Sequence, residues 1–117
     1  MAIEAIKRDP AWKNGEYAAP PAQGLRMASA MVFIMGSSPL QMQKAFPTRA
    51  AAEQRVDAFL DHAVASTDAN DEIYYLNASR NYDPSPRLES ITTPVLWINS
   101  ADDYINPPEL GLSLIHI

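Results

Sequence analysis

Apolar residues in the first two thirds of the chain recur three and four positions apart, which is the spacing of an amphipathic helix. Prolines and glycines interrupt this pattern and mark the ends of the predicted helices. Residues 11–24 are predicted to form a loop, because Asn14-Gly15 is a turn dipeptide and Pro20-Pro21 favours extended backbone. The pattern predicts helices over residues 2–8, 25–35, 40–46 and 48–65, and a further helix that begins near residue 68 and ends before residue 83.

The pattern changes after residue 90. Residues 95–98 are Val-Leu-Trp-Ile, a short and wholly apolar run that is typical of a strand covered on both faces of a parallel sheet. A polar loop over residues 99–103 follows, and Pro107 marks the first turn of another predicted helix. A single parallel strand cannot form a sheet, so we expect its partner strands to lie outside this sequence. The predicted fold class is therefore α/β, as a fragment with several helices and one core strand.

Composition narrows the range of functions. The chain has 117 residues and a formal net charge of −5, from 9 basic and 14 acidic side chains. The basic residues are not clustered, which argues against a nucleic acid partner, since phosphate binding needs grouped Lys and Arg. The chain has no Cys, which excludes disulfides, thiolate catalysis and Cys-based zinc sites. The longest apolar stretch, residues 27–35, is shorter than the roughly 20 residues of a membrane-spanning helix. We expect a soluble protein, cytoplasmic or exported, whose native N-terminus lies further upstream.

Two stretches carry specific motifs. The first contains Asp9-Pro10-Ala11-Trp12, Gly15, Tyr17 and Gly24-Leu25, and the second contains Tyr82-Asp83-Pro84, Pro94 and Asp102-Asp103. The second stretch resembles the strand that bears the acidic residue of the catalytic triad in α/β-hydrolases. The first is similar to the homoserine O-acetyltransferase branch of that fold, in the segment that leads from the core sheet into a helical lid. Together the resemblance covers residues 2–110.

The resemblance implies that Asp103 is the acid of a Ser-Asp-His triad. In this family a serine attacks an acyl donor, a histidine accepts its proton, and the acid fixes the tautomer of the histidine. The order along the chain is serine, acid, histidine, which would put the serine before Met1 and the histidine after Ile117. The implied substrate is a small-molecule acyl ester or acyl donor, with no cofactor and no metal, and the oligomeric state stays open.

Two positions leave alternatives open. From the residues alone, Asp102 and Asp103 also fit a solvated loop after a strand, where Asp is common. Acetyltransferases of this branch usually carry an arginine after the Gly-Leu pair, thought to hold the carboxylate of the amino acid. Here that position is Ser29, and Arg26 would point in a different direction from the helix. A hydrolase, or an acyltransferase with another acceptor, therefore fits as well as homoserine acetylation.

Other prominent side chains receive structural interpretations. We expect His62 to be a surface residue, and we assign no catalytic role to His116. Asn77-Ala78-Ser79 matches a glycosylation sequon, but its place inside a predicted helix favours a chance match. We expect packing roles for Met27, Met31, Met35, Tyr74, Tyr75 and Tyr82. The three methionines alternatively line an acyl tunnel.

The ends of the chain divide it into parts. Residues 1–111 are predicted to be a partial α/β-hydrolase domain, with the helical lid at about 18–82 and the core strand and acid loop at 83–111. Residues 112–117 can be back-translated into a transposon end used in sequencing libraries, so we predict a non-native tail. The sequence thus predicts a fragment of a serine-dependent acyltransferase or hydrolase that is inactive as this chain. A stand-alone helical binding module and a pseudoenzyme are the alternatives from other classes.

Overall fold

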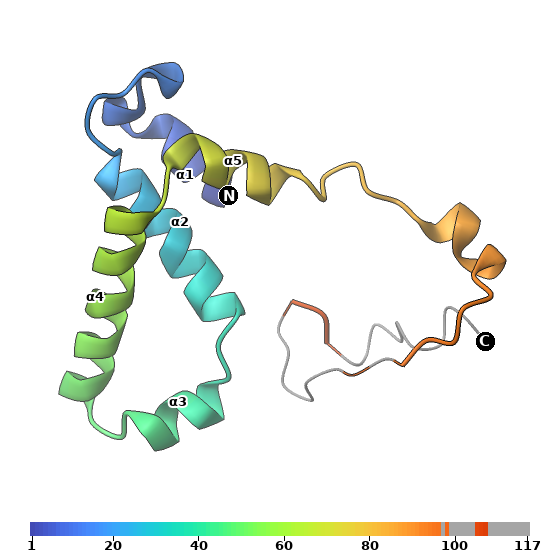
Figure 1. Cartoon of the computed structure of the whole chain (residues 1–117). Coiled ribbons are helices and arrows are strands. Elements are labelled where there is room, and N and C mark those ends of the chain that lie inside the picture. Colours follow the sequence, from blue (N-terminus) through green and yellow to red (C-terminus); the bar gives the residue numbers. More distant parts are fainter. Residues whose placement is uncertain (97, 99–104, 108–117) are drawn as a thin grey trace.

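The computed structural model describes residues 1–96, 98 and 105–107, and the elements in this part of the chain are all helical (Figure 1). The helices predicted from the apolar spacing are confirmed, with ends that differ from the prediction by a few residues. In chain order the elements are α1 (Ala2–Arg8), the 3-10 helix η1 (Pro10–Gly15), α2 (Ala22–Met35), α3 (Pro39–Ala45), α4 (Arg49–Ser66), α5 (Ala69–Asn77) and the 3-10 helix η2 (Ser85–Ser90).

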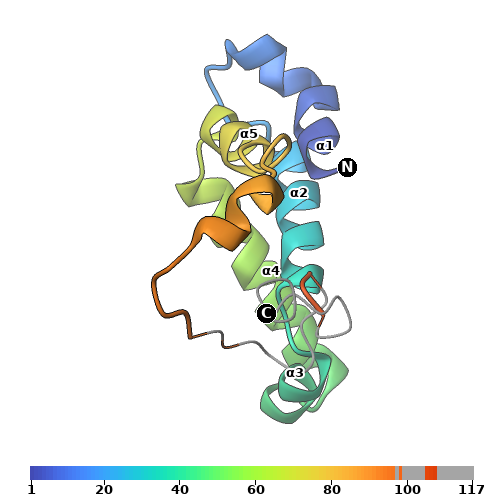
Figure 2. The ribbon, with the colours of Figure 1, turned by 90° about the vertical axis from the view of Figure 1, so that its right-hand side faces the viewer.

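A small core lies where α1, α2 and α5 meet. Ile6 of α1 and Leu25 of α2 are fully buried, and Ala28 and Ala69 join them in one cluster. Figures 1 and 2 show α1 and α5 beside the N-terminal half of α2. Burial of one Leu or Ile side chain contributes about 1.5–3 kcal/mol, so this cluster is the main hydrophobic stabilisation of the helical part.

Gly24 lets α1 and α2 approach each other closely. A Cβ atom at this position would lie 2.8 Å from the carbonyl oxygen of Ala5 and 2.8 Å from Cα of Ile6, both backbone atoms. The Gly24 N–H donates to Oδ2 of Asp9 over 2.8 Å, which fixes the start of α2 against the end of α1. Glycine at this position therefore serves packing between helices.

We expect Gly24→Ala to destabilise the chain by about 1–3 kcal/mol, because the added methyl group must displace the backbone of α1. The sign of this stability change is informative. Alanine is a better helix former than glycine by about 0.8–1 kcal/mol, so helix propensity alone would make the substitution stabilising. Urea unfolding followed by far-UV circular dichroism measures the difference. Gly36→Ala is the matched control, because Gly36 has an ordinary φ of −92° and its added Cβ would meet only Val32 O, at 3.1 Å. Equal effects of the two substitutions would show that the close approach at Gly24 is unimportant.

Helix α2 also packs against α4, and α3 connects these two helices (Figure 1). The rings of Phe33 and Phe59 lie 4.9 Å apart, and the guanidinium of Arg55 lies 5.6 Å from both ring centroids. Arg26 of α2 forms ion pairs with Asp57 and Asp61 of α4. Exposed ion pairs contribute little, so the ring contacts matter more for this interface.

Side-chain caps explain where the helices begin. The side chains of Ser38, Thr48 and Asp68 accept hydrogen bonds from backbone N–H groups in the first turns of α3, α4 and α5. Such caps are each worth about 1 kcal/mol. Helices α4 and α5 therefore begin directly after Thr48 and Asp68, close to the starts predicted from the sequence.

The loop predicted at residues 11–24 is only partly correct. Asp9 caps a 3-10 helix that begins at Pro10, with Oδ1 accepting from the N–H of Ala11 over 2.9 Å. The turn signal of Asn14-Gly15 is confirmed, since Asn14 and Gly15 have φ values of 56° and 96°. Helix α2 begins at Ala22, three residues earlier than predicted, because Gly24 is tolerated where it contacts α1.

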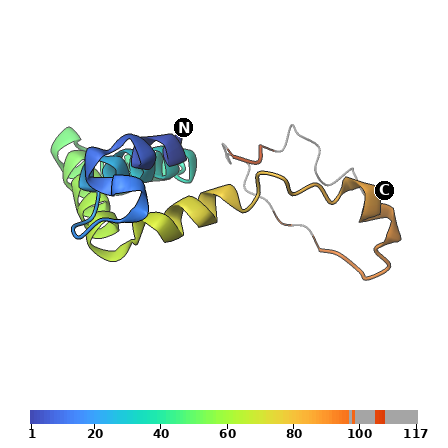
Figure 3. The same cartoon turned by 90° about the horizontal axis from the view of Figure 1, so that it is seen from above.

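The predicted α/β fold class is wrong for the part of the chain that the structure describes. Within the predicted strand, Val95, Leu96 and Ile98 are 69%, 85% and 82% exposed and form no strand, and Trp97 lies outside the described residues. Figure 3 shows the chain leading away from the helices after α5. A strand needs a neighbouring strand for its backbone hydrogen bonds, and none is available among the described residues.

Candidate functional site

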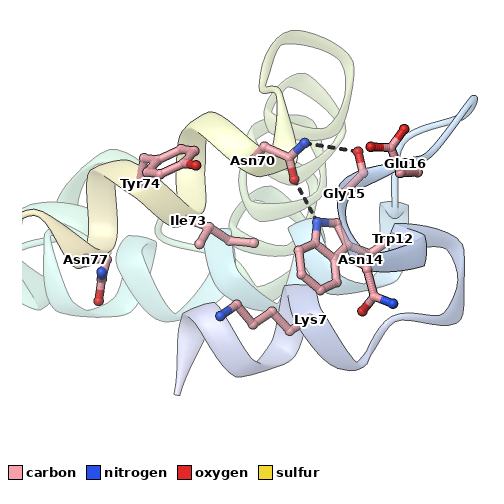
Figure 4. Close-up of a pocket in the computed structure, with 9 residues that line it drawn as sticks. All are labelled: Lys7, Trp12, Asn14, Gly15, Glu16, Asn70, Ile73, Tyr74 and Asn77. Carbon is pink, nitrogen blue, oxygen red and sulfur yellow. Dashed lines mark hydrogen bonds between the residues drawn. The ribbon is translucent and has the colours of Figure 1, made fainter.

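The residues of the first sequence motif meet between η1 and α5. Trp12 of η1 donates a hydrogen bond from Nε1 to Oδ1 of Asn70 on α5, over 2.8 Å. Asn70 in turn donates from Nδ2 to the carbonyl oxygen of Gly15, over 3.1 Å (Figure 4). The side chain of Asn70 thus joins α5 to both the indole and the backbone of η1.

Tyr17 makes a second connection to α5. Its hydroxyl donates to Oδ2 of Asp68 over 2.5 Å and accepts from the N–H of Ala69 over 2.9 Å. The other carboxylate oxygen of Asp68 caps α5, accepting from the N–H groups of Asn70 at 2.9 Å and Asp71 at 3.1 Å. One carboxylate therefore holds both the start of α5 and the segment before α2.

These contacts change the acidity of both groups. The hydrogen bond from Tyr17, and then the backbone N–H of Asp71, lower the pKa of Asp68. Burial, and then the hydrogen bond to Asp68, raise the pKa of Tyr17 above 10. The contact therefore needs an ionised Asp68 and a protonated Tyr17. Because the pKa of Asp68 is lowered by folding, its ionised form stabilises the fold at pH values above the unfolded pKa of about 3.9. This stabilisation is lost as the pH falls through the folded pKa. Because the pKa of Tyr17 is raised by folding, its protonated form stabilises the fold below about pH 10. This stabilisation is lost as the pH rises through the folded pKa.

We expect thermal stability to fall more steeply between pH 5 and pH 2 in the unmodified chain than in Tyr17→Phe, because the phenylalanine removes the main cause of the low Asp68 pKa. The difference in melting temperature between the two proteins should therefore be largest near neutral pH and should shrink below about pH 4. Circular dichroism melts at several pH values measure it. Tyr82→Phe is the control, since Tyr82 is 74% exposed. Parallel pH profiles for the unmodified chain and Tyr17→Phe would contradict the coupling.

A pocket of about 410 Å³ lies beside Trp12, between α1, η1 and α5 (Figure 4). Trp12 and Ile73 supply its apolar surface, and both are partly buried against the core. We call it the Trp12 pocket, and it is lined by Lys7, Trp12, Asn14, Gly15, Glu16, Asn70, Ile73, Tyr74 and Asn77. Its volume lies within the range of small-molecule sites, and its lining combines apolar and polar groups, several of them exposed.

The structure places few of the predicted site residues. Asp103, Asp102 and His116 lie outside the described residues, so the triad acid stays a prediction. His62 is exposed on α4, as predicted. Ser29 is buried on α2, at 9% exposure. The cation nearest to it in sequence, Arg26, is paired with acidic residues of α4.

The packing roles predicted for the methionines and tyrosines are mostly wrong. Met27 and Met35 are 56% and 44% exposed, because α2 turns only part of its surface toward α1 and α4. Tyr74 and Tyr75 are about three-quarters exposed, and Tyr74 lines the Trp12 pocket. The sequon residue Asn77 is exposed at the last position of α5 and lines the same pocket.

Sequence reasoning missed the Trp12 pocket. The available signal was the motif around Trp12, but the partner residues on α5 are 58 positions further along the chain. No group of His, Cys, Asp or Glu residues that could hold a metal ion occurs in the described ranges. Within the same ranges, no helix has the length and apolar character required to cross a membrane.

Comparison with known proteins identifies the relatives of this chain. It matches no family model and no solved structure. It is 29% identical to the homoserine O-acetyltransferase of Pelobacter propionicus over 124 residues, which cover 89% of this chain and 33% of the relative. The enzyme of the same name from Haloarcula marismortui is 30% identical over 115 residues, covering 77% of this chain and 29% of the relative. That of Trichlorobacter lovleyi is 30% identical over 124 residues, with coverage of 89% and 34%.

The chain spans about a third of the length of these curated relatives. The similarity covers most of the chain. The resemblance inferred from the sequence motifs is confirmed, since most of the chain is similar to one part of several enzymes named homoserine O-acetyltransferase.

Proposed function

We propose that this chain is part of an acyltransferase that moves an acyl group from a small-molecule donor to a hydroxyl acceptor. The observation that carries the proposal is its similarity, over most of its length, to several enzymes named homoserine O-acetyltransferase. Asp9, Trp12 and Tyr17 belong to the segment that carries the resemblance, and each makes a hydrogen bond between elements. They give the family motif a definite task, which is to hold α1, η1, α2 and α5 together.

In this proposal Asp103 is the acid of a Ser-Asp-His triad. The serine hydroxyl attacks the acyl carbonyl while the histidine accepts its proton, and Asp103 accepts the hydrogen bond from the other imidazole N–H. The acyl group is then bound to the serine as an ester, and the donor leaves with the proton. The acceptor hydroxyl attacks this ester, the histidine takes its proton, and the serine is regenerated. The serine and the histidine belong to parts of the protein outside residues 1–111.

One observation favours an acceptor other than homoserine. The resemblance implies an arginine after the Gly-Leu pair, and the residue at that position is the buried Ser29. The nearby Arg26 is paired with Asp57 and Asp61 of α4. A hydroxyl acceptor without a carboxylate, or water, then becomes the second candidate, and water as acceptor would make the protein a hydrolase.

A chimera tests both candidates. Residues 1–111 replace the matching third of the Pelobacter propionicus enzyme, and the purified chimera is assayed for transfer of an acetyl group to homoserine and for release of acetate. Transfer supports acetylation of the amino acid, and acetate release without transfer supports the hydrolase. A chimera that unfolds cooperatively but does neither would overturn the proposal. If the large exchange fails to fold, exchange of residues 94–107 alone keeps the acid loop testable.

A further inference from the structure

We propose that the Trp12 pocket binds a small aromatic carboxylate. The inference rests on the lining of this pocket and is independent of the acyl transfer proposed above. The first argument is size, since this open pocket of about 410 Å³ has room for a small ligand. It also has one apolar wall with polar groups around it. In small-molecule sites the apolar surface usually provides affinity, and the polar groups fix the orientation of the ligand.

The apolar wall is held in place before any ligand arrives. The indole of Trp12 is fixed by its 2.8 Å hydrogen bond to Asn70, and Asn70 is fixed by its bond to the carbonyl oxygen of Gly15. Figure 4 shows Ile73 beside the six-membered ring of Trp12. A rigid aromatic surface beside an aliphatic one favours a flat ligand, because little side-chain freedom is lost on binding.

The charges around the pocket give the ligand its polarity. Lys7 runs along the pocket beside the Trp12 ring, and its ammonium has no carboxylate partner among the described residues (Figure 4). The amide of Asn77 and the hydroxyl of Tyr74 can donate hydrogen bonds from α5 on the same side. Glu16 lies at the opposite end, beyond Gly15 (Figure 4). A carboxylate is therefore drawn toward Lys7 and repelled from Glu16, which orients the ligand along the Trp12 ring.

Three compounds with the same indole ring test this inference: indole-3-acetate, the neutral indole-3-acetamide and the cationic tryptamine. Each is titrated into the full 117-residue chain carrying Trp97→Phe, so that the indole N–H signal in nitrogen-edited NMR spectra comes from Trp12 alone. We expect indole-3-acetate to bind more tightly than the amide and to shift the Trp12 signal. Tryptamine should bind most weakly.

Variants of two lysines decide whether the pocket is responsible. Lys7→Met should raise the Kd of indole-3-acetate about two- to fivefold, to that of the amide, as expected for loss of an exposed ion pair. Lys13→Met is the matched control, because Lys13 does not line the pocket, and it should leave the Kd unchanged. Equal binding of all three compounds, a preference for tryptamine, or no shift of the Trp12 signal would each overturn the proposal. None of these results depends on acyl transfer, so they are separate from the test of the proposed function.

Discussion

Asp103→Asn in the chimera is expected to lower acyl transfer by about four orders of magnitude. An asparagine at this position of a triad keeps the shape of the side chain but stabilises the wrong tautomer of the histidine, which can then no longer accept the proton of the serine. A loss of this size corresponds to more than 5 kcal/mol of transition-state stabilisation.

Asp102→Asn is the matched control, because it makes the same chemical change one residue away in the same predicted loop. We expect it to reduce turnover by less than tenfold. The assay is initial-rate acetyl transfer and acetate release at saturating donor, with circular dichroism melts to show that each variant is folded. A large loss in Asp102→Asn and near-normal turnover in Asp103→Asn would move the triad role to Asp102. Small losses in both would remove the acid from this loop.

The helices were predictable because their signals are local. The apolar spacing of α4 and the caps at Thr48 and Asp68 lie within a few residues of the helices that they define. The turn at Asn14-Gly15 was equally visible, since these residue types tolerate positive φ. The 3-10 geometry of η1 was not, because it follows from the cap that Asp9 places on it.

The strand at residues 95–98 could not be judged from its own composition. An apolar, β-branched run indicates only that the segment is suited to burial. Whether it forms a strand depends on other strands that supply its backbone hydrogen bonds. The same limit explains the methionines of α2. Their apolar character predicts burial, yet exposure of Met27 is decided by which neighbouring helices are present.

Only a small part of the candidate site was visible in the sequence. The motif around Trp12 and Tyr17 identified residues with definite contacts, and the resemblance that they indicated is confirmed. The structural role of these residues was not visible in the sequence. Trp12 bonds to Asn70 and Tyr17 bonds to Asp68, and each pair is more than fifty positions apart in the sequence. The motif residues proved to be the contacts that hold α5 to the start of the chain. This contact network is also what builds the Trp12 pocket.

Leu25→Ala should have the largest effect on stability. Leu25 is fully buried where α2 packs against α1. Removal of a buried leucine side chain typically costs about 2–5 kcal/mol of stability, and the cost rises with the volume of the cavity left behind. The core cluster has only two large members, Ile6 and Leu25, and the other two are alanines that cannot fill the space. A domain with so small a core has little stability to lose, since the free energy of unfolding of ordinary domains is only about 5–15 kcal/mol. We therefore expect Leu25→Ala to abolish the cooperative transition in urea and to release α1 from α2.

Ile34→Ala is the control for this prediction, because it removes a similar volume from the same helix at a position that is 68% exposed. A change within about 0.5 kcal/mol is expected there, as for most surface substitutions. Amide hydrogen exchange adds a local measure, since protection in α1 should disappear in Leu25→Ala and persist in Ile34→Ala. Equal effects of the two substitutions would mean that the contact of α1 with α2 does not hold the helical part together. The Trp12 pocket, which lies between α1, η1 and α5, would then lack a stable frame.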